Sequence, residues 1–151
     1  VGSEMCIRDR SDYEKLRDKA GEEGLLCHGE YNQHNVLMLK PGTAVTNFEH
    51  WGFDTQMADL YRFMRKILEK YNWDVRFGKE MLKAYHEIKP VSKEEWTNLK
   101  IRFSYPEKYW KLANYYYTHR KTWISVKNTE KLQNLIRQRE AWKRYCASFF
   151  F

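Results

Sequence analysis

The stretch that decides the fold is Leu25 to Val36, which reads LLCHGEYNQHNV. An apolar pair leads into His-Gly and an acid, and an Asn comes just before a second apolar run at residues 36–39. This order predicts a strand, a loop and another strand. Gly29 stands where the loop must turn sharply, which glycine permits because it has no Cβ.

The predicted loop carries a carboxylate, Glu30, five residues before an amide oxygen, that of Asn35. Phosphoryl transfer uses such a pair, because a carboxylate orients or deprotonates the acceptor hydroxyl while an Asn oxygen helps to hold Mg²⁺. A polar hairpin loop without chemistry is the alternative, since motifs this short recur by chance.

A turn signal, Pro41-Gly42, separates the second apolar run from the sequence AVTNFE at residues 44–49. This segment predicts another short strand. A period of two would place Asn47 and Glu49 on one face of it. Strand, loop and hairpin in this order are typical of the lower lobe of kinase-like folds, in which the acid after the hairpin binds the metal.

Residues 28–35, together with Asn47-Phe48-Glu49, Asp54 and Asp59-Leu60, resemble the aminoglycoside and choline phosphotransferase superfamily. The sequences at 47–51, 59–61, 65–68 and 72–74 are most similar to its CotS-type spore-coat branch. The resemblance covers nearly everything after residue 11. It implies an α+β, mostly α fold: the C-terminal lobe of a protein-kinase-like protein, with a small β-hairpin element on a helical body and no N-lobe. It also implies synthesis in the cytoplasm and a place in the spore coat.

Carried over residue by residue, the resemblance puts Glu30 at the catalytic-base position and Asn35 and Asn47 at metal-ligand positions. Asp59 becomes an acid that braces the loop, and His28 a structural residue beneath it. Mg²⁺ and ATP are implied by the resemblance alone. We expect them to bind weakly or not at all to this chain, because the N-lobe that grips the nucleotide is absent.

Two positions depart from the superfamily, which usually has Asp at both. Glu30 is one methylene longer than Asp, and Asn47 carries no charge. Mg²⁺ favours anionic oxygen, so an amide in place of the main carboxylate should weaken the metal site. We expect Glu49 to substitute, so a working enzyme would hold its metal with Asn35 and Glu49.

Three functional classes stay open at this point. The first is a pseudokinase that serves as a scaffold for other spore-coat proteins, and the second is an active phosphotransferase for a small hydroxyl substrate. The third is a basic module that binds nucleic acid. The net charge is +7, and residues 120–144 hold eight Lys or Arg against Glu130 and Glu140. Interleaved with Trp123 and Trp142, these charges are typical either of a polyanion surface or of a solvated helix face; we favour the solvated face.

Helical periodicity predicts the rest of the chain. Ser11 is expected to cap a first helix that Gly21 and Gly24 end, and further helices are expected at 57–71, from Asp74 towards Pro90, from Ser92, from Pro106, and near 130–146. We expect two sets of side chains to pack in the core: the stripe Tyr109, Leu112, Ala113, Tyr116 and Tyr117, and the set Leu132, Leu135, Ile136, Trp142 and the stem of Arg139.

Residues 1–10 fit nothing that follows, and we interpret them as a non-native adaptor-like segment; a frayed helix start is the alternative. Residues 11–151 are expected to form one domain, which suits a hydrophobic content of 42%. No apolar run of about 18 residues and no secretory signal is present. Cysteines at 6, 27 and 146 have no metal-binding spacing, so we expect reduced intracellular thiols. No His pair has the spacing that would favour zinc.

Overall fold

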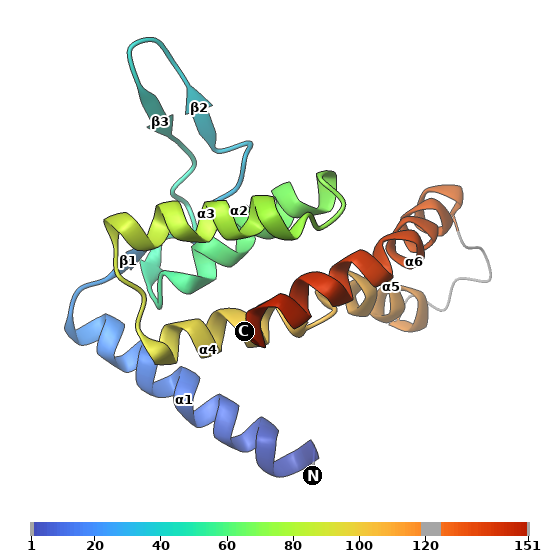
Figure 1. The fold of residues 1–151 in the computed structure, drawn as a ribbon, viewed down its shortest axis with the longest axis horizontal. Helices are drawn as coiled ribbons and strands as arrows, with labels where there is room; N and C mark the ends of the chain where they lie inside the picture. Colours follow the sequence, from blue (N-terminus) through green and yellow to red (C-terminus); the bar gives the residue numbers. More distant parts are fainter. Residues whose placement is uncertain (1, 119–124, 151) are drawn as a thin grey trace.

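A computed structural model of the chain describes residues 2–118 and 125–150 (Figure 1). Helices dominate it, which confirms the predicted mostly α fold with a small β element. The elements in order are α1 (Gly2–Glu22), β1 (Leu26–Cys27), β2 (Val36–Met38), β3 (Thr43–Val45), β4 (Gly52–Phe53), α2 (Met57–Lys70), α3 (Val75–Ile88), α4 (Lys93–Ser104), α5 (Glu107–Thr118), α6 (Val126–Ala147) and a 3₁₀ turn, η1 (Ser148–Phe150).

The strands form two separate antiparallel pairs. β2 pairs with β3, with Val36 opposite Val45, and this hairpin projects away from the helices (Figure 1). β1 pairs with β4, with Cys27 opposite Gly52. The second pair holds the start of the loop at residues 28–35 against the chain that leads into α2. Strand β4 was not predicted, because two residues are too few to show a period.

The strand predicted at 44–49 is shorter in the structure. β3 ends at Val45, and Asn47 has a φ of 69°, in the left-handed region that extended strands do not use. The prediction that Asn47 and Glu49 share a strand face is therefore wrong, because no strand continues through them.

The first helix is longer than predicted. α1 begins at Gly2, so Ser11 lies inside the helix and is not its N-cap. The helix ends at Glu22, close to the expected position, and Gly24 follows with a φ of 66°. That residues 1–10 are foreign to the native chain stays a prediction.

Caps fix the starts of the later helices. The Asp74 side chain accepts a hydrogen bond from Phe77 N at 2.7 Å at the start of α3. Ser92 and Glu95 form a capping box at the start of α4. Each bond satisfies a backbone N–H that has no partner within its own helix. These two starts confirm the predicted ones.

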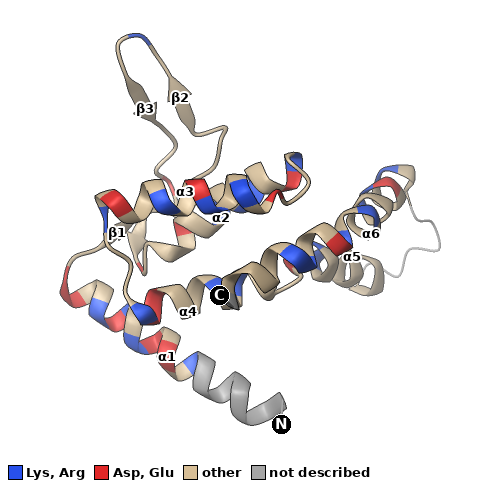
Figure 2. Cartoon of the chain, in the orientation of Figure 1, with Lys and Arg blue, Asp and Glu red and all other residues tan. Residues whose placement is uncertain are grey.

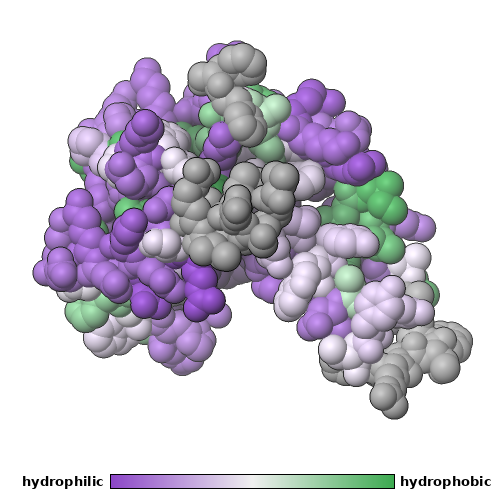
Figure 3. Space-filling view, turned by 90° about the horizontal axis from the view of Figure 1, so that it is seen from below, coloured by the Kyte–Doolittle hydropathy of each residue, from purple (hydrophilic) through white to green (hydrophobic). Residues whose placement is uncertain are grey.

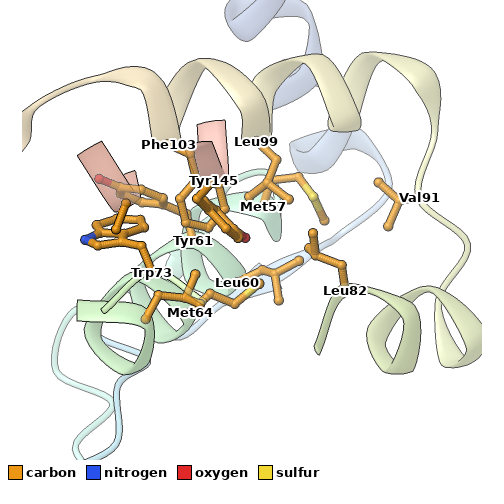
Figure 4. Close-up of a cluster of buried hydrophobic side chains, with 12 residues drawn as sticks. Met57, Leu60, Tyr61, Met64, Trp73, Leu82, Val91, Leu99, Phe103 and Tyr145 are labelled. Carbon is orange, nitrogen blue, oxygen red and sulfur yellow. The ribbon is translucent and has the colours of Figure 1, made fainter. Parts of the chain in front are cut away.

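The core is formed by one face of α2 and the side chains that α3, α4 and α6 place against it (Figure 4). Met57, Met64 and Leu68 from α2 are completely buried. The rings of Phe103 and Tyr145 meet with centroids 5.2 Å apart in an edge-to-face arrangement. Large aromatic side chains contribute most of the apolar area in such a core.

Helix α5 and the first part of α6 pack side by side and extend beyond the body; we call this pair the α5–α6 arm (Figure 1). The prediction that the aromatic stripe of α5 packs in the core is wrong. No residue of α5 is buried, Tyr117 is 77% exposed, and Tyr109 and Tyr116 are also exposed. Pale and green surface, the colours of aromatic and apolar residues, lies over this end of the molecule (Figure 3).

Helix α6 begins at Val126, four residues before the predicted start. Trp142 packs against the core as predicted. The predicted burial of Leu132 and Ile136 is wrong, because this part of α6 extends beyond the body with α5. Leu132, Ile136 and Arg139 are exposed, while Leu135 and Trp142 are half-buried. The buried residues of α6 are Ala141 and Tyr145, near its C-terminal end. Lys and Arg are spread along α6 (Figure 2). Trp123 lies outside the described residues.

Candidate functional site

The loop at residues 28–35 is attached to the helical body through Asp59. One oxygen of this carboxylate accepts a hydrogen bond from His28 N at 2.5 Å, and the other accepts one from Gly29 N at 3.1 Å. Asp59 stands in the first turn of α2. Hydrogen bonds from backbone N–H groups to an ionised carboxylate are among the strong ones, so this contact fixes where the loop begins.

His28 is buried beneath the loop. Its Nδ1 accepts a hydrogen bond from Glu30 N at 3.1 Å, so the ring proton sits on Nε2, which donates to Thr46 O at 2.8 Å. The ring also packs on Phe48, with centroids 4.5 Å apart. His28 thereby joins the loop to the segment that follows β3.

Gly29 has a φ of 80°, in the left-handed region. A Cβ added at this position would lie 1.9 Å from His50 O. Both the backbone conformation and the lack of space require glycine here. The close approach brings the His50 backbone against the loop.

Glu30 presents its side chain on the surface, 48% exposed, with Oε1 at 3.8 Å from His50 Nε2. Its backbone carbonyl is held from inside the loop, because the side-chain amides of Asn32 and Asn35 each donate to Glu30 O at 2.9 Å. The Glu30 carboxylate, at the position that the resemblance implies for a catalytic base, is therefore accessible and carried by a fixed backbone. His50 was not singled out in the sequence, although it follows the NFE motif directly.

The two implied metal positions, Asn35 and Asn47, are separated in sequence but meet at one backbone junction, and neither carries a charge. The side-chain nitrogen of Asn35 donates a hydrogen bond to Glu30 O. The backbone carbonyl of Asn35 accepts a hydrogen bond from Thr46 N at 3.0 Å, and this backbone contact brings the neighbouring Asn47 close to Asn35. Asn47 and Glu49 are exposed. Because no strand runs through residues 47–49, Asn47 and Glu49 do not share a strand face, and this argument for Glu49 as a second ligand of the same ion no longer holds.

This donor set does not fit a tight Mg²⁺ site. Mg²⁺ prefers carboxylate oxygens, and the two implied positions offer neutral amide oxygens only. Within residues 10–118 and 125–149, no three His, Cys, Asp or Glu side chains gather in a group that would hold a metal ion.

A cavity of about 610 Å³ beside the loop was not predicted. Tyr31 of the loop, Phe63 of α2 and Tyr85 of α3 line it, together with Lys89. Lys89 donates a hydrogen bond to the Gln56 side chain and lies 3.8 Å from Glu95. The residues that line this cavity are far apart in the sequence, so no local sequence pattern indicates the cavity.

Below the loop, two further groups are tied to Asp54. The Tyr13 hydroxyl of α1 donates to the Asp54 carboxylate at 3.1 Å, and the Cys27 thiol donates to Asp54 O at 3.2 Å. Burial, with the charges of Asp59 and Asp54, raises the pKa of Cys27 to about 11. The thiol is therefore protonated at neutral pH and is a poor nucleophile.

The chain is similar to known proteins along most of its length. A family described as spore coat putative kinase YutH matches residues 8–149. The chain belongs to this family. The expectation of a spore-coat protein related to kinase-like phosphotransferases is thus confirmed at the level of the family.

Two relatives agree with this assignment. The chain is 24% identical over 135 residues to spore coat protein S of Bacillus subtilis (strain 168). The matched region covers 88% of this chain and 38% of that protein. An aminoglycoside phosphotransferase structure from Alicyclobacillus acidocaldarius has the same fold, with a TM-score of 0.80 and 19% identity, over 91% of this chain and 41% of that one. The chain thus spans about two fifths of the length of these relatives. No helix in the described parts is long and apolar enough to cross a membrane.

Proposed function

We propose that this chain is the C-terminal lobe of a pseudokinase that acts as a scaffold in the spore coat, where it contacts other coat proteins. The observation that carries the proposal is the contrast within one loop. Asp59, His28 and Gly29 keep the loop in a fixed shape, whereas the two implied metal positions, Asn35 and Asn47, carry no charge. A loop that keeps its shape but lacks charged metal ligands suits a structural role better than phosphoryl transfer, because phosphoryl transfer needs a bound Mg²⁺ ion.

The second candidate is an active phosphotransferase that modifies a small hydroxyl substrate. It is favoured by the exposed carboxylate of Glu30, which lies 3.8 Å from His50 Nε2 and is accessible to an incoming hydroxyl. In this function Glu30 would orient or deprotonate the acceptor. Bound Mg²⁺ and ATP would supply the charge neutralisation and the phosphoryl group. Asn35, Asn47 and Glu49 are the side chains available to the metal.

Phosphoryl transfer across a Mg²⁺ titration distinguishes the two functions. The protein is assayed in its longest natural form, as wild type and as the variants Asn47→Asp, Glu49→Gln and Glu30→Gln. The scaffold function predicts no transfer by the wild type or by Glu49→Gln in folded protein. Mg²⁺-dependent phosphoryl transfer by the wild type, abolished in Glu30→Gln, would reject the scaffold function in favour of the active phosphotransferase.

A further inference from the structure

A second cavity, of about 550 Å³, lies where α3, α4 and the C-terminal end of α6 meet. None of its lining residues comes from the loop at 28–35. Its floor is apolar and aromatic, formed by Leu82, Trp96, Tyr145 and Phe149. It therefore offers an apolar surface that is independent of the site described above.

The rim of this cavity is basic. Lys79 and Lys83 stand one turn apart on α3, and Lys93 and Lys100 stand two turns apart on α4. Lys83 forms only an exposed ion pair with Glu87, at 3.8 Å. Within the described part of the chain, Lys79 and Lys93 have no ion-pair partner. Two cationic side chains thus border the cavity without an acid to neutralise them.

His86 adds a defined hydrogen-bond donor to the lining. Its Nδ1 accepts a hydrogen bond from Val91 N at 3.0 Å, so the proton of the neutral ring is on Nε2. The cavity wall therefore combines ammonium groups with an imidazole N–H. All of these groups can donate hydrogen bonds to an anion.

The floor contains a polar group without a partner. Tyr145 is 1% exposed, and its hydroxyl makes no hydrogen bond within the described residues. Burial raises the pKa of Tyr145, so the hydroxyl stays protonated and able to donate. A buried hydroxyl without a partner is unfavourable. This oxygen has almost no accessible surface, so the Tyr145 ring underlies the floor of the cavity and its hydroxyl does not reach a ligand there.

We propose that this cavity binds a small ligand that has a multiply charged anionic group and an apolar or aromatic body, of which a phosphate monoester is the simplest example. The lysines and His86 bind the anionic group. Leu82, Trp96 and Phe149 cover the apolar body. The site is separate from any phosphoryl transfer at Glu30.

Calorimetry with phenyl phosphate tests this proposal on the 151-residue chain in a buffer without phosphate. We expect saturable binding that weakens as salt is raised, because the rim charges are exposed to solvent. Phenol and inorganic phosphate each carry half of the expected ligand and should bind more weakly. Phenol binding as tightly as phenyl phosphate, or no saturable binding of phenyl phosphate, would overturn the proposal.

Matched variants then locate the binding. Lys79→Gln with Lys93→Gln should weaken phenyl phosphate by about tenfold, because charged hydrogen bonds are lost. Lys127→Gln with Lys131→Gln makes the same change of net charge on α6, outside the cavity, and should weaken it by less than about twofold. Equal losses in the two lysine pairs would show that the ligand does not occupy this cavity.

Discussion

At the scale of single residues, Gly29 has the strictest requirement. Its φ is 80° and a Cβ would meet His50 O at 1.9 Å. We therefore expect Gly29→Ala to lower the free energy of unfolding by about 2 kcal/mol or more, measured by urea denaturation. Gly42→Ala is the control, because a Cβ there would have no atom within 4 Å. Equal stability of the two variants would be inconsistent with this account of the loop.

The two buried tyrosines of the core offer a second comparison. The Tyr61 hydroxyl donates to Glu107 at 3.2 Å, whereas the Tyr145 hydroxyl has no partner among the described residues. Tyr145→Phe should therefore raise the free energy of unfolding by about 1 kcal/mol, and Tyr61→Phe should lower it by a similar amount. Thermal unfolding in a buffer without phosphate compares them. A loss of stability in both variants would mean that the Tyr145 hydroxyl does have a partner.

At the scale of elements, an ion-pair network joins α2 to the start of α5. Arg65 Nη1 lies 2.8 Å from Glu69 Oε1, and Arg65 Nε lies 3.6 Å from Glu107 Oε2, while Lys111 also pairs with Glu107. Burial acts to raise the pKa of Glu107, but the hydrogen bond from Lys111 and the charge of Arg65 outweigh it, so the pKa is lowered from its ordinary value of 4.5.

The sign of the pH dependence follows from this shift. A carboxylate whose pKa is lower in the folded state stabilises the fold above its ordinary pKa and stops doing so as the pH falls through the folded value. We expect Glu107→Gln to be less stable than the wild type by about 1 kcal/mol at neutral pH, and this difference to disappear in acid. Denaturation across pH measures it, with exposed Glu130→Gln as the control. A difference that grows in acid would have the wrong sign.

The α5–α6 arm makes a further prediction. Because Tyr117 is 77% exposed, Tyr117→Ala should change the free energy of unfolding by less than about 0.5 kcal/mol. Phe103→Ala, in the core, should cost about 3 kcal/mol or more. Urea denaturation compares the two. A large loss from Tyr117→Ala would restore the core role that the periodicity first indicated.

The contrast between these elements shows what sequence can predict. The starts of α3 and α4 are readable because Asp74 and Ser92 cap them locally. The exposure of the α5 stripe is not readable, since periodicity identifies an apolar face but not whether another element covers it. The end of β3 depends on the left-handed Asn47, and the loop cavity depends on Lys89 meeting Gln56 from a distant segment. Neither feature has a local signature.

At the scale of the whole molecule, the chain joins a helical body of kinase-like fold to a loop whose implied metal positions are neutral. The solved aminoglycoside phosphotransferase supports the fold with a TM-score of 0.80. The loop is bound to that body through Asp59 and His28. The proposed scaffold function therefore depends on the neutral side chain at residue 47.

Calorimetry of Mg²⁺ with ATP, on the wild type and on Asn47→Asp, tests this central claim most directly. We expect weak or no binding of Mg²⁺ and ATP by the wild-type chain, because its implied metal positions are amides, and a measurable gain of Mg²⁺ affinity in Asn47→Asp, which adds the missing carboxylate. Asn114→Asp, on exposed α5, controls for the added charge. A micromolar dissociation constant for the wild type, unchanged by Asn47→Asp, would contradict the claim.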